Sequence, residues 1–545
     1  MNFNRLFNHR AKNITSAAFI LGGASLISKI LGLIREMIFA YLFGAGEEMD
    51  IYFTAFRIPD FLFNILILGA VSTAFIPIFT EYWRKSKEEA WQLCNNVLCI
   101  FLSCLIIFSI ILAIFAPYLM KIVAPGFKGE KLRLVTIMTR IMLLSPIILG
   151  ISHIFGSVLQ YFSRFLIYSL APIVYNVGII FGAVFLVPRI GIVGLAWGVV
   201  LGAFLHLFIQ LPSVLLVGYR FRFMIDIVHE GVKKIFKLML PRAIGLAANQ
   251  INLIIITAIA STLSIGSISV FNYSNNLQYI PVSLFGFSFA TAAFPAFARS
   301  FSYKAKKDFL QKFISTFSQI LFFTLPLSIL FFLLRAQITR VIYGLGKFTW
   351  EDTRLTAASL GLFSFSIFAQ ALVPLICKAF YSFQDTKTPV KISIISIILN
   401  IFLSFSFTLL LSQPNAFYHS LVSILKLEGI TEISVLGFPL AFSFSSMVNL
   451  FCLLIALKKK VGDEWDLKLG EAFFRLLSLS ITCGLITFLL LHLSSLILDL
   501  QTFLGVFLQT VFAGGGGVIF YIYFIKMLKF PEYRLIFTDK KGTLL

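Results

Sequence analysis

Long runs of apolar residues are the feature of this sequence that most limits how it can fold. A helix that crosses a bilayer needs about 20 predominantly apolar residues, and runs of that length recur along the whole chain. Of the 545 residues, 59% are hydrophobic and 13% are charged, whereas soluble domains have about 45–50% apolar and about 25% charged residues. Such a chain has too few polar side chains to cover itself with a water-facing surface. We therefore predict an all-α integral membrane protein.

The apolar runs predict about fourteen transmembrane helices. Several runs are longer than a straight span needs, which implies tilted or kinked helices. The first run follows Arg5, Arg10 and Lys12 and is too long for the apolar core of a signal peptide, so we expect it to be retained. The predicted spans are 15–43, 50–82, 91–116, 134–161, 166–187, 191–217, 239–264, 267–298, 310–334, 355–381, 388–411, 433–457, 472–494 and 502–525.

The formal charge of +21 would suggest a nucleic-acid partner if the protein were soluble. Here the basic residues gather in short loops between apolar runs, which is the positive-inside pattern. We find no nucleic-acid-binding motif, so we interpret the excess charge as topology and attraction to anionic headgroups. The larger number of Lys and Arg residues in the loops on one side of the membrane predicts that both termini lie in the cytoplasm. The largest basic groups lie in 84–87, 220–237, 304–307 and 458–460.

The sequence offers no cofactor or metal motif. Its six cysteines lie inside apolar runs without the spacing of metal ligands, so we interpret them as small packing residues. A nucleotide-binding Gly-x-x-x-x-Gly-Lys motif is also missing, which argues against coupling to ATP. Coupling to a monovalent ion or to the membrane potential is the expected alternative.

Two pairs of similar segments indicate an internal repeat. Thr73–Phe79 resembles Thr291–Phe297, 218 residues further on, and Ala171–Pro172 resembles Thr388–Pro389 at an offset of 217. The two offsets agree, although chance matches are common in helices rich in Phe and Ala. They predict two six-helix lobes in a pseudo-twofold arrangement around a central cavity, with two additional C-terminal helices.

The predicted parts of the chain are an N-lobe at 1–217, a cytoplasmic linker at 218–238, a C-lobe at 239–457 and the additional helices at 472–525. Pro59 and Pro281 would bend the second and eighth spans around the cavity. With Asp50 and Gly32 they form the predicted structural or gating positions.

Charged residues occur inside the first two predicted spans, where each costs about 2.5–3.5 kcal/mol at the helix centre. At about 100° per residue, the polar positions of the second span fall within a sector of about 80°. Such a stripe is expected to face a solvated cavity. The positions are Lys29, Arg35 and Glu36 in the first span, and Asp50, Arg57, Asp60 and Asn64 in the second.

The positive residues of this group point to an anionic, phosphate-bearing cargo, because the guanidinium fork matches phosphate oxygens. Lys29, Arg35 and Arg57 would bind the phosphate, and Glu36 and Asp60 would orient them. Salt bridges within the group that serve only assembly are the alternative.

Three further positions have competing interpretations. Asn64 lies on the polar stripe of the second span. Arg242, at the cytoplasmic start of the seventh span, would either join the cargo site or extend toward the headgroups. Asp50 would be either a gating residue or a solvated helix end.

Five segments resemble the MurJ (MviN) family, the lipid II flippases of peptidoglycan synthesis. They are Ser28–Glu36 (SKILGLIRE), Phe43–Gly46 (FGAG), Ala55–Asp60 (AFRIPD), Gly245–Leu253 (GLAANQINL) and Asp385–Pro389 (DTKTP). They occur in the family's order, and the similarity runs along nearly the whole chain.

The resemblance implies a fold of the MOP transporter superfamily and a transporter rather than an enzyme. It implies a flippase that moves lipid II across a bacterial cytoplasmic membrane by alternating access. In that family the extra helices line a groove for the polyprenyl tail, and basic cavity residues hold the diphosphate-sugar head. The implied partners are lipid II, membrane lipids and cell-wall synthesis enzymes. By position, Lys29 and Arg35 match the basic cavity residues of the family's first helix. Glu36, Asp50 and Arg57 match the family's usual polar pattern.

The chain also departs from the family pattern. Phe63 and Asn276 stand where many members have arginine, and the seventh and eleventh spans lack carboxylates for a sodium site. The head-group site is thus less basic, although Asn276 remains a candidate contact. A flippase for another polyprenyl-diphosphate oligosaccharide, of the O-antigen or capsule type, stays open as an alternative. A multidrug antiporter, a glycosyltransferase and a non-transporting cell-wall scaffold are weaker alternatives.

Overall fold

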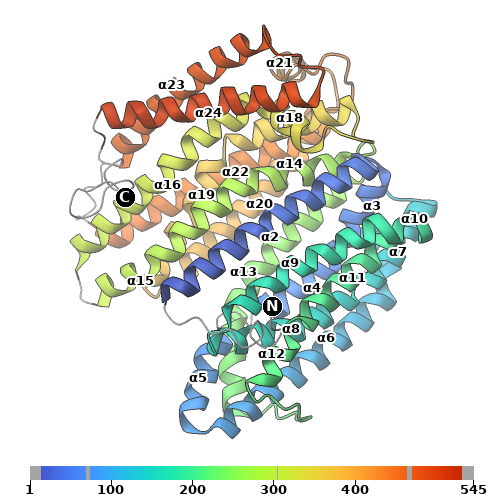
Figure 1. The fold of residues 1–545 in the computed structure, drawn as a ribbon, viewed down its shortest axis with the longest axis vertical. Helices are drawn as coiled ribbons and strands as arrows, with labels where there is room; N and C mark the ends of the chain where they lie inside the picture. The colour runs from blue at the N-terminus through green and yellow to red at the C-terminus, as the bar shows by residue number, and fades with distance from the viewer. Residues whose placement is uncertain (1–13, 69–73, 303–304, 463–468, 529, 531–545) are drawn as a thin grey trace. The chain divides into compact units, whose positions relative to one another are not determined.

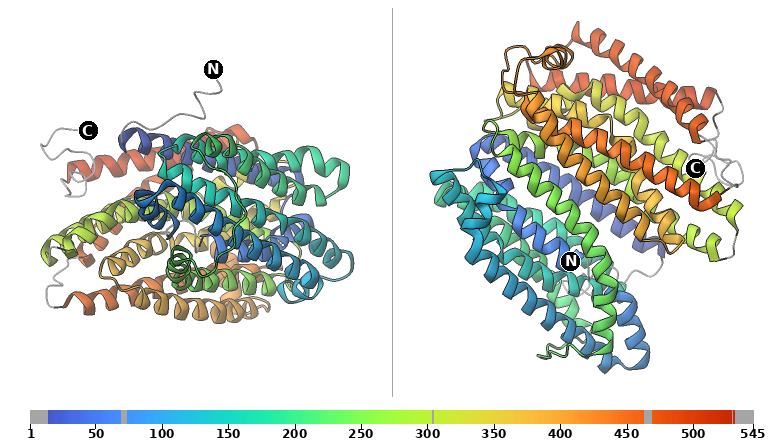
Figure 2. Two further views of the ribbon diagram at one scale, coloured as in Figure 1. Left: turned by 90° about the horizontal axis from the view of Figure 1, so that it is seen from below. Right: turned by 180° about the vertical axis from the view of Figure 1, so that it is seen from behind.

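The computed structural model describes residues 14–68, 74–302, 305–462, 469–528 and 530 of the chain, and all regular elements there are helices (Figures 1 and 2). The side chains of 14–21, 68, 241–242 and 301–302 lie outside the description. The chain forms two compact units that divide between Ile268 and Ser269. An all-helical architecture was predicted from the apolar runs and is confirmed.

The first unit begins with a long helix and continues through a broken one. The second predicted span is divided at Phe56 into α3 and α4, and a π-helical turn follows. The elements are α2 (Ile14–Phe43), α3 (Glu47–Ala55), α4 (Arg57–Phe63), η1 (Asn64–Leu68), α5 (Ile76–Lys85), α6 (Lys87–Val123), α7 (Gly129–Met142), α8 (Leu144–Tyr161), α9 (Phe165–Phe181), η3 (Gly182–Leu186), α10 (Val187–Ile190), α11 (Val193–Phe208), α12 (Leu211–Leu216) and α13 (Glu230–Ala260).

The second unit repeats long helices with a π-helical turn after a proline. α14 ends at Pro281, which precedes η4 directly. The elements are α14 (Ser267–Pro281), η4 (Val282–Phe287), α15 (Ser288–Ser302), α16 (Lys306–Leu333), α17 (Arg335–Tyr343), α18 (Trp350–Ser364), α19 (Ile367–Ser382), α20 (Lys387–Leu410), α21 (Ala416–Leu425), η5 (Ser434–Leu436), α22 (Gly437–Val461), α23 (Leu469–Ser495) and α24 (Phe503–Met527).

Most of the predicted spans coincide with membrane-length helices. Among the described residues, eleven helices are long and apolar enough to cross a membrane, or twelve if α18 and α19, which meet at 46°, form one span. They correspond to the third to fourteenth predicted spans. The first two, 15–43 and 50–82, each include residues outside the description and are not among the eleven. The count of fourteen is therefore not confirmed.

The segment between α12 and α13 is shorter than the predicted linker, because α13 already begins at Glu230. Buried Asn95 and Asn96 on α6 hold this segment through its backbone. Asn95 Nδ2 donates to the carbonyl of Arg220, and Asn96 Nδ2 donates to that of Asp226. Helix α13 belongs to the first compact unit, and the predicted lobe boundaries stay a prediction.

Helices α9 and α11 of the first unit lie side by side (Figure 1) and approach closely through glycines. A Cβ on Gly178 would lie 2.4 Å from the backbone of Gly202, and one on Gly182 would lie 2.5 Å from Gly198. Close backbone approach of this kind is the usual packing of small residues between membrane helices. It fixes α9 firmly beside α11, and α9 also packs against α2.

The second unit uses polar residues in a similar helix pair. On α20, Asn400 donates to Ser445 of α22 at 3.0 Å, and Gly437 of α22 packs against the backbone of Thr408. Helices α23 and α24 run side by side as well (Figure 2). The core of this unit is rich in phenylalanine, such as Phe313 and Phe380, both fully buried.

The loop before α20 contains Asp385, from the segment Asp385–Pro389. Its carboxylate accepts the backbone N–H and the hydroxyl of Thr388, and Lys460 Nζ at 3.1 Å. Burial acts to raise the pKa of Asp385, but these hydrogen bonds from Thr388 and Lys460 lower it below its ordinary value. The segment therefore forms a capped start for α20.

Candidate functional site

Arg35 on α2 is held by two neighbours in the first unit. Its Nη2 donates to Glu36 Oε1 at 2.5 Å, and its Nη1 donates to Asn176 Oδ1 on α9 at 3.0 Å. The Arg35 side chain is 24% exposed, whereas that of Glu36 is 6% exposed. The guanidinium also lies 5.8 Å from the ring of Phe39. Arg35 is thus fixed at the edge of the unit with part of its surface accessible.

Arg57 and Asp60 lie together on α4. Arg57 is buried, and its Nε donates to Thr257 Oγ1 on α13 at 2.7 Å. Asp60 is half-buried and close enough to interact electrostatically with both Arg57 and Arg35. Helices α2 and α4 therefore contribute to one cluster of two cations and two carboxylates, namely Arg35, Glu36, Arg57 and Asp60. We call these four residues the charged cluster.

The charged cluster retains unsatisfied hydrogen-bonding atoms. Within the described part of the chain, Arg35 Nε and Glu36 Oε2 are buried and have no hydrogen-bond partner. Buried polar atoms without partners are costly. An oxygen of a bound anion would give Arg35 Nε the acceptor that it lacks.

Asp50, a predicted gating residue, is a buried anchor rather than a solvated helix end. It lies in the first turn of α3 and is 2% exposed. Its Oδ2 accepts the backbone N–H of Gly266 at 2.8 Å and lies 3.8 Å from Lys131 Nζ. Gly266 has φ +90°, and a Cβ there would lie 2.1 Å from the carbonyl oxygen of Ala45. Only glycine fits this position, so the contact ties α3 to the segment after α13.

Other predicted positions lie outside the charged cluster. Lys29 is exposed on α2, about 9 Å along the helix from Arg35. Asn64 is half-buried, and its amide donates to the carbonyl of Asp60 at 2.8 Å, which stabilises the start of η1. Asn276 is exposed on α14 of the second unit. The side chain of Arg242 lies outside the described residues.

The three other predicted structural or gating positions differ in their surroundings. Pro59 is buried in the first turn of α4, directly after the break at Phe56. Pro281 is buried where α14 changes into η4. A Cβ on Gly32 would meet no atom within 4 Å, so close packing does not explain this glycine. Their gating roles stay predictions.

Sequence reasoning missed the neutral residues that hold the arginines. Asn176 is a single amide in the apolar run 166–187, and Thr257 lies in the run 239–264. An isolated amide inside an apolar span indicates a buried polar contact. The sequence does not show which residue it contacts, because Arg35 lies 141 residues away from Asn176 along the chain.

Phe63 occupies the neighbourhood in which the family pattern would place an arginine. Its ring contacts His153 edge-on at 5.2 Å. His153 stacks on His206, whose Nδ1 lies 2.7 Å from Ser152 Oγ. This side of α4 therefore carries aromatic and neutral hydrogen-bonding groups in place of a fixed cation.

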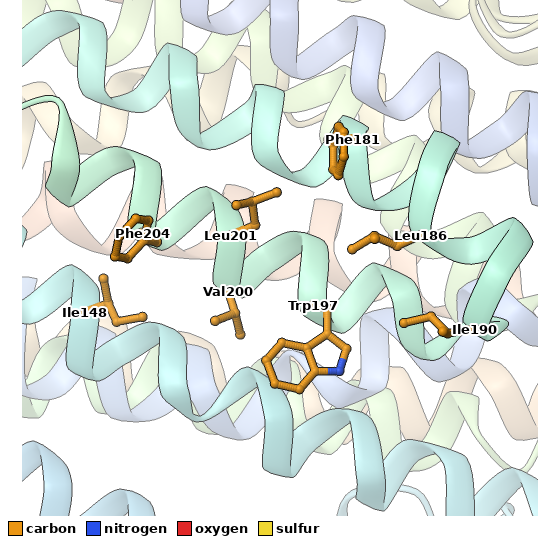
Figure 3. A pocket seen from close by; sticks show the side chains of 8 residues that line it. All are labelled: Ile148, Phe181, Leu186, Ile190, Trp197, Val200, Leu201 and Phe204. Carbon is orange, nitrogen blue, oxygen red and sulfur yellow. The ribbon is translucent and has the colours of Figure 1, made fainter.

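An apolar groove lies elsewhere on the first unit (Figure 3). Its volume is about 580 Å³, and eight apolar residues of α8, α9, η3, α10 and α11 line it. It contains none of the predicted site residues, and the indole nitrogen of Trp197 is its only labelled polar side-chain atom (Figure 3). Such a lining suits hydrocarbon chains and not a charged head group. The lining residues are Ile148, Phe181, Leu186, Ile190, Trp197, Val200, Leu201 and Phe204.

Among the described residues, no group of three or more His, Cys, Asp or Glu side chains is arranged to hold a metal ion. The charged cluster itself combines two arginines with two carboxylates. Its two arginines are the residue type suited to binding an anion.

Similarity to known proteins covers most of the chain. Residues 39–513 match the family described as Lipid II flippase MurJ. The probable lipid II flippase MurJ of Buchnera aphidicola subsp. Schizaphis graminum is 32% identical over 474 residues, which cover 85% of this chain and 87% of that protein. The lipid II flippase MurJ of Burkholderia cenocepacia is 29% identical over 402 residues, covering 70% of this chain and 76% of that protein.

Solved structures show the same fold. A lipid II flippase MurJ in an inward closed conformation superposes with a TM-score of 0.75 at 24% identity, covering 94% of this chain and all of that one. An inward-facing multidrug resistance MATE transporter of the MOP superfamily gives 0.65 at 13% identity, covering 82% of this chain and 98% of that one. The predicted fold class is thereby confirmed. The match along 39–513 and the relative that is 32% identical lead to one assignment: the chain belongs to the lipid II flippase MurJ family.

Proposed function

We propose that the protein is a flippase that carries lipid II from the cytoplasmic to the outer face of a bacterial cytoplasmic membrane by alternating access. Family membership supports the cargo and the role in peptidoglycan synthesis. The observation that carries the proposal is the charged cluster on α2 and α4, in which two arginines lie together within the first two predicted spans. Cationic side chains are costly there and usually mark a transport path.

In this mechanism Arg35 and Arg57 bind the diphosphate of the cargo. Glu36 and Asp60 hold the arginines in place when no cargo is bound, since an isolated buried cation would be costly. A diphosphate would take over the arginine hydrogen bonds during binding, and the carboxylates would regain them on release. The cargo's polyprenyl tail remains in the lipid throughout.

The other predicted residues surround this step. Lys29, exposed on α2, would attract the anionic head before it reaches Arg35. Asn64, Arg242 and Asn276 would contact the sugar or the phosphate. Asp50, Gly32, Pro59 and Pro281 would serve the structural changes of the cycle. These roles stay proposals that variants at each position test.

We further propose that both termini face the cytoplasm, as the basic loops indicate. Moving one charge through the membrane field is worth about 2.3 kcal/mol per 100 mV, so the membrane potential would drive one half of the cycle. A monovalent ion is the alternative source. Membrane lipids and cell-wall synthesis enzymes are the expected partners, with no nucleic acid and no resident cofactor.

The experiment is transport of fluorescent lipid II in vesicles that contain the purified protein. Arg35→Ala and Arg57→Ala should each reduce transport at least tenfold, since a hydrogen bond to a charged group contributes about 1.5–3 kcal/mol. Arg133→Ala is the matched control, because Arg133 is 70% exposed and pairs with Glu130 on the surface of α7. Full transport by both cluster variants would refute the proposal.

A flippase for another polyprenyl-diphosphate oligosaccharide is the second candidate. The observation that favours it is the replacement of two cations usual in the family by Phe63 and by the exposed amide Asn276. Expression in cells depleted of their own lipid II flippase separates the two. Rescue of growth and cell shape supports lipid II as the cargo, whereas failure of a well-expressed protein supports the other class.

A further inference from the structure

Asn176 links Arg35 to helix α9, and its orientation is unambiguous. The residue is 8% exposed. Its Oδ1 accepts from Arg35 Nη1 at 3.0 Å, and its Nδ2 donates to the carbonyl of Pro172 at 3.0 Å. A guanidinium only donates and a carbonyl only accepts, so each end of the amide has just one compatible assignment. The carbonyl of Pro172 thus turns the amide oxygen toward Arg35.

We propose that Asn176 is a positioning residue for Arg35 in binding the anionic head of the cargo. The inference deepens the proposed function and rests on it. An amide oxygen holds the guanidinium by a hydrogen bond without neutralising its charge. A carboxylate at the same place would form an ion pair and compete with the phosphate.

The remaining contacts of Arg35 show which donor is left for a ligand. Nη1 is engaged by Asn176 and Nη2 by Glu36. Nε is buried and has no hydrogen-bond partner in the described part of the chain. Two anchors on the terminal nitrogens therefore fix the plane of the guanidinium, and Nε is the donor that remains for a ligand oxygen. Without Asn176, Arg35 would keep Glu36 as its only anchor of this kind.

Helix α9 is a firm support for this contact. It packs against α2 and against α11 (Figure 1), and the close approach of Gly178 to Gly202 leaves no room for a Cβ between α9 and α11. Rigid supporting residues are what hold a binding group in its productive geometry. The loss of Asn176 should therefore weaken binding more than it alters the fold.

The test measures binding of undecaprenyl diphosphate to the full-length protein in nanodiscs, together with lipid II transport in vesicles. Asn176→Ala should weaken binding about tenfold or more, and should raise the lipid II concentration needed for half-maximal transport while the maximal rate falls less. Ser169→Ala is the matched control. Ser169 lies seven residues earlier on the same buried face of α9, and its hydroxyl donates within the helix to the carbonyl of Leu166.

A double-mutant cycle with Arg35→Ala separates positioning from a general structural role. If Asn176 acts through Arg35, Asn176→Ala has no further effect on binding in the Arg35→Ala background. An equal loss in both backgrounds would overturn the inference and leave the proposed function standing, as would unchanged binding by Asn176→Ala when Arg35→Ala is defective. If Arg35→Ala itself binds and transports normally, both the role of Arg35 and this inference are overturned.

Discussion

Replacing Asp50 with alanine should destabilise the first unit by about 2–4 kcal/mol, because a buried hydrogen bond to a charged group contributes about 1.5–3 kcal/mol. The bond at stake joins the carboxylate to the backbone N–H of Gly266 at 2.8 Å, and both residues are buried. The ion pair with Lys131 adds at most about 1 kcal/mol, since its 3.8 Å distance is long and the Lys131 ammonium keeps a second partner in the Phe127 ring, whose centroid lies 4.1 Å away.

Asp50→Asn divides this effect into its parts. An asparagine oxygen still accepts the N–H of Gly266, so only the charge is lost and the cost should fall to about 1 kcal/mol. Gly266→Ala should be at least as damaging as Asp50→Ala. Its Cβ would collide with the carbonyl of Ala45, and alanine is strained at φ +90°.

The assay is thermal unfolding of the three purified variants in one detergent, with transport measured on the folded fraction. The expected order of stability is wild type, Asp50→Asn, Asp50→Ala, then Gly266→Ala. Equal losses for Asp50→Asn and Asp50→Ala would show that the charge, and not the hydrogen bond to Gly266, stabilises the unit. A fully stable Gly266→Ala protein would refute the geometry of this contact.

Three further predictions follow from local contacts. Asp385→Ala should lower the free energy of unfolding by about 1–2 kcal/mol at neutral pH, because it removes the cap of α20. The pKa of Asp385 is lowered in the folded protein, so the difference between the variant and the wild type should disappear as the pH falls below about 4. Unfolding midpoints measured at several pH values test this. Gly178→Leu should prevent α9 from packing on α11, so that little folded protein is recovered by size-exclusion chromatography. Thr257→Val should reduce lipid II transport about tenfold or more by removing the acceptor of Arg57 Nε, whereas Thr257→Ser, which keeps the hydroxyl, should transport normally.

Hydropathy alone predicted the helices from the third span onward, because the length of an apolar run is a local property. It could not predict how helices break. The division of the second span at Phe56 and the 46° bend between α18 and α19 depend on backbone geometry that an average over 20 residues conceals. Proline was a partial guide, since Pro59 and Pro281 lie next to such irregularities.

Helical periodicity was less reliable for the site than for the fold. It placed Lys29 and Glu36 on nearly the same face of the first span, yet Lys29 is exposed and Glu36 is 4% exposed. Seven residues separate them by about 10 Å along the axis, so they have different neighbours. The partners of the arginines were also beyond reach, because Asn176 and Thr257 come from distant parts of the chain.

The partners of the two arginines bear directly on how an anion could be held. Each guanidinium is anchored by a neutral oxygen from another helix, Asn176 for Arg35 and Thr257 for Arg57. A neutral anchor fixes the geometry and leaves the positive charge intact, whereas a carboxylate anchor would cancel it. Arg35 has both kinds, since Glu36 takes Nη2. In the proposed mechanism an incoming diphosphate would bind Arg35 through Nε, would displace Glu36 from Nη2 and would leave Asn176 in place, so that the carboxylate would supply reversibility and the amide would supply position.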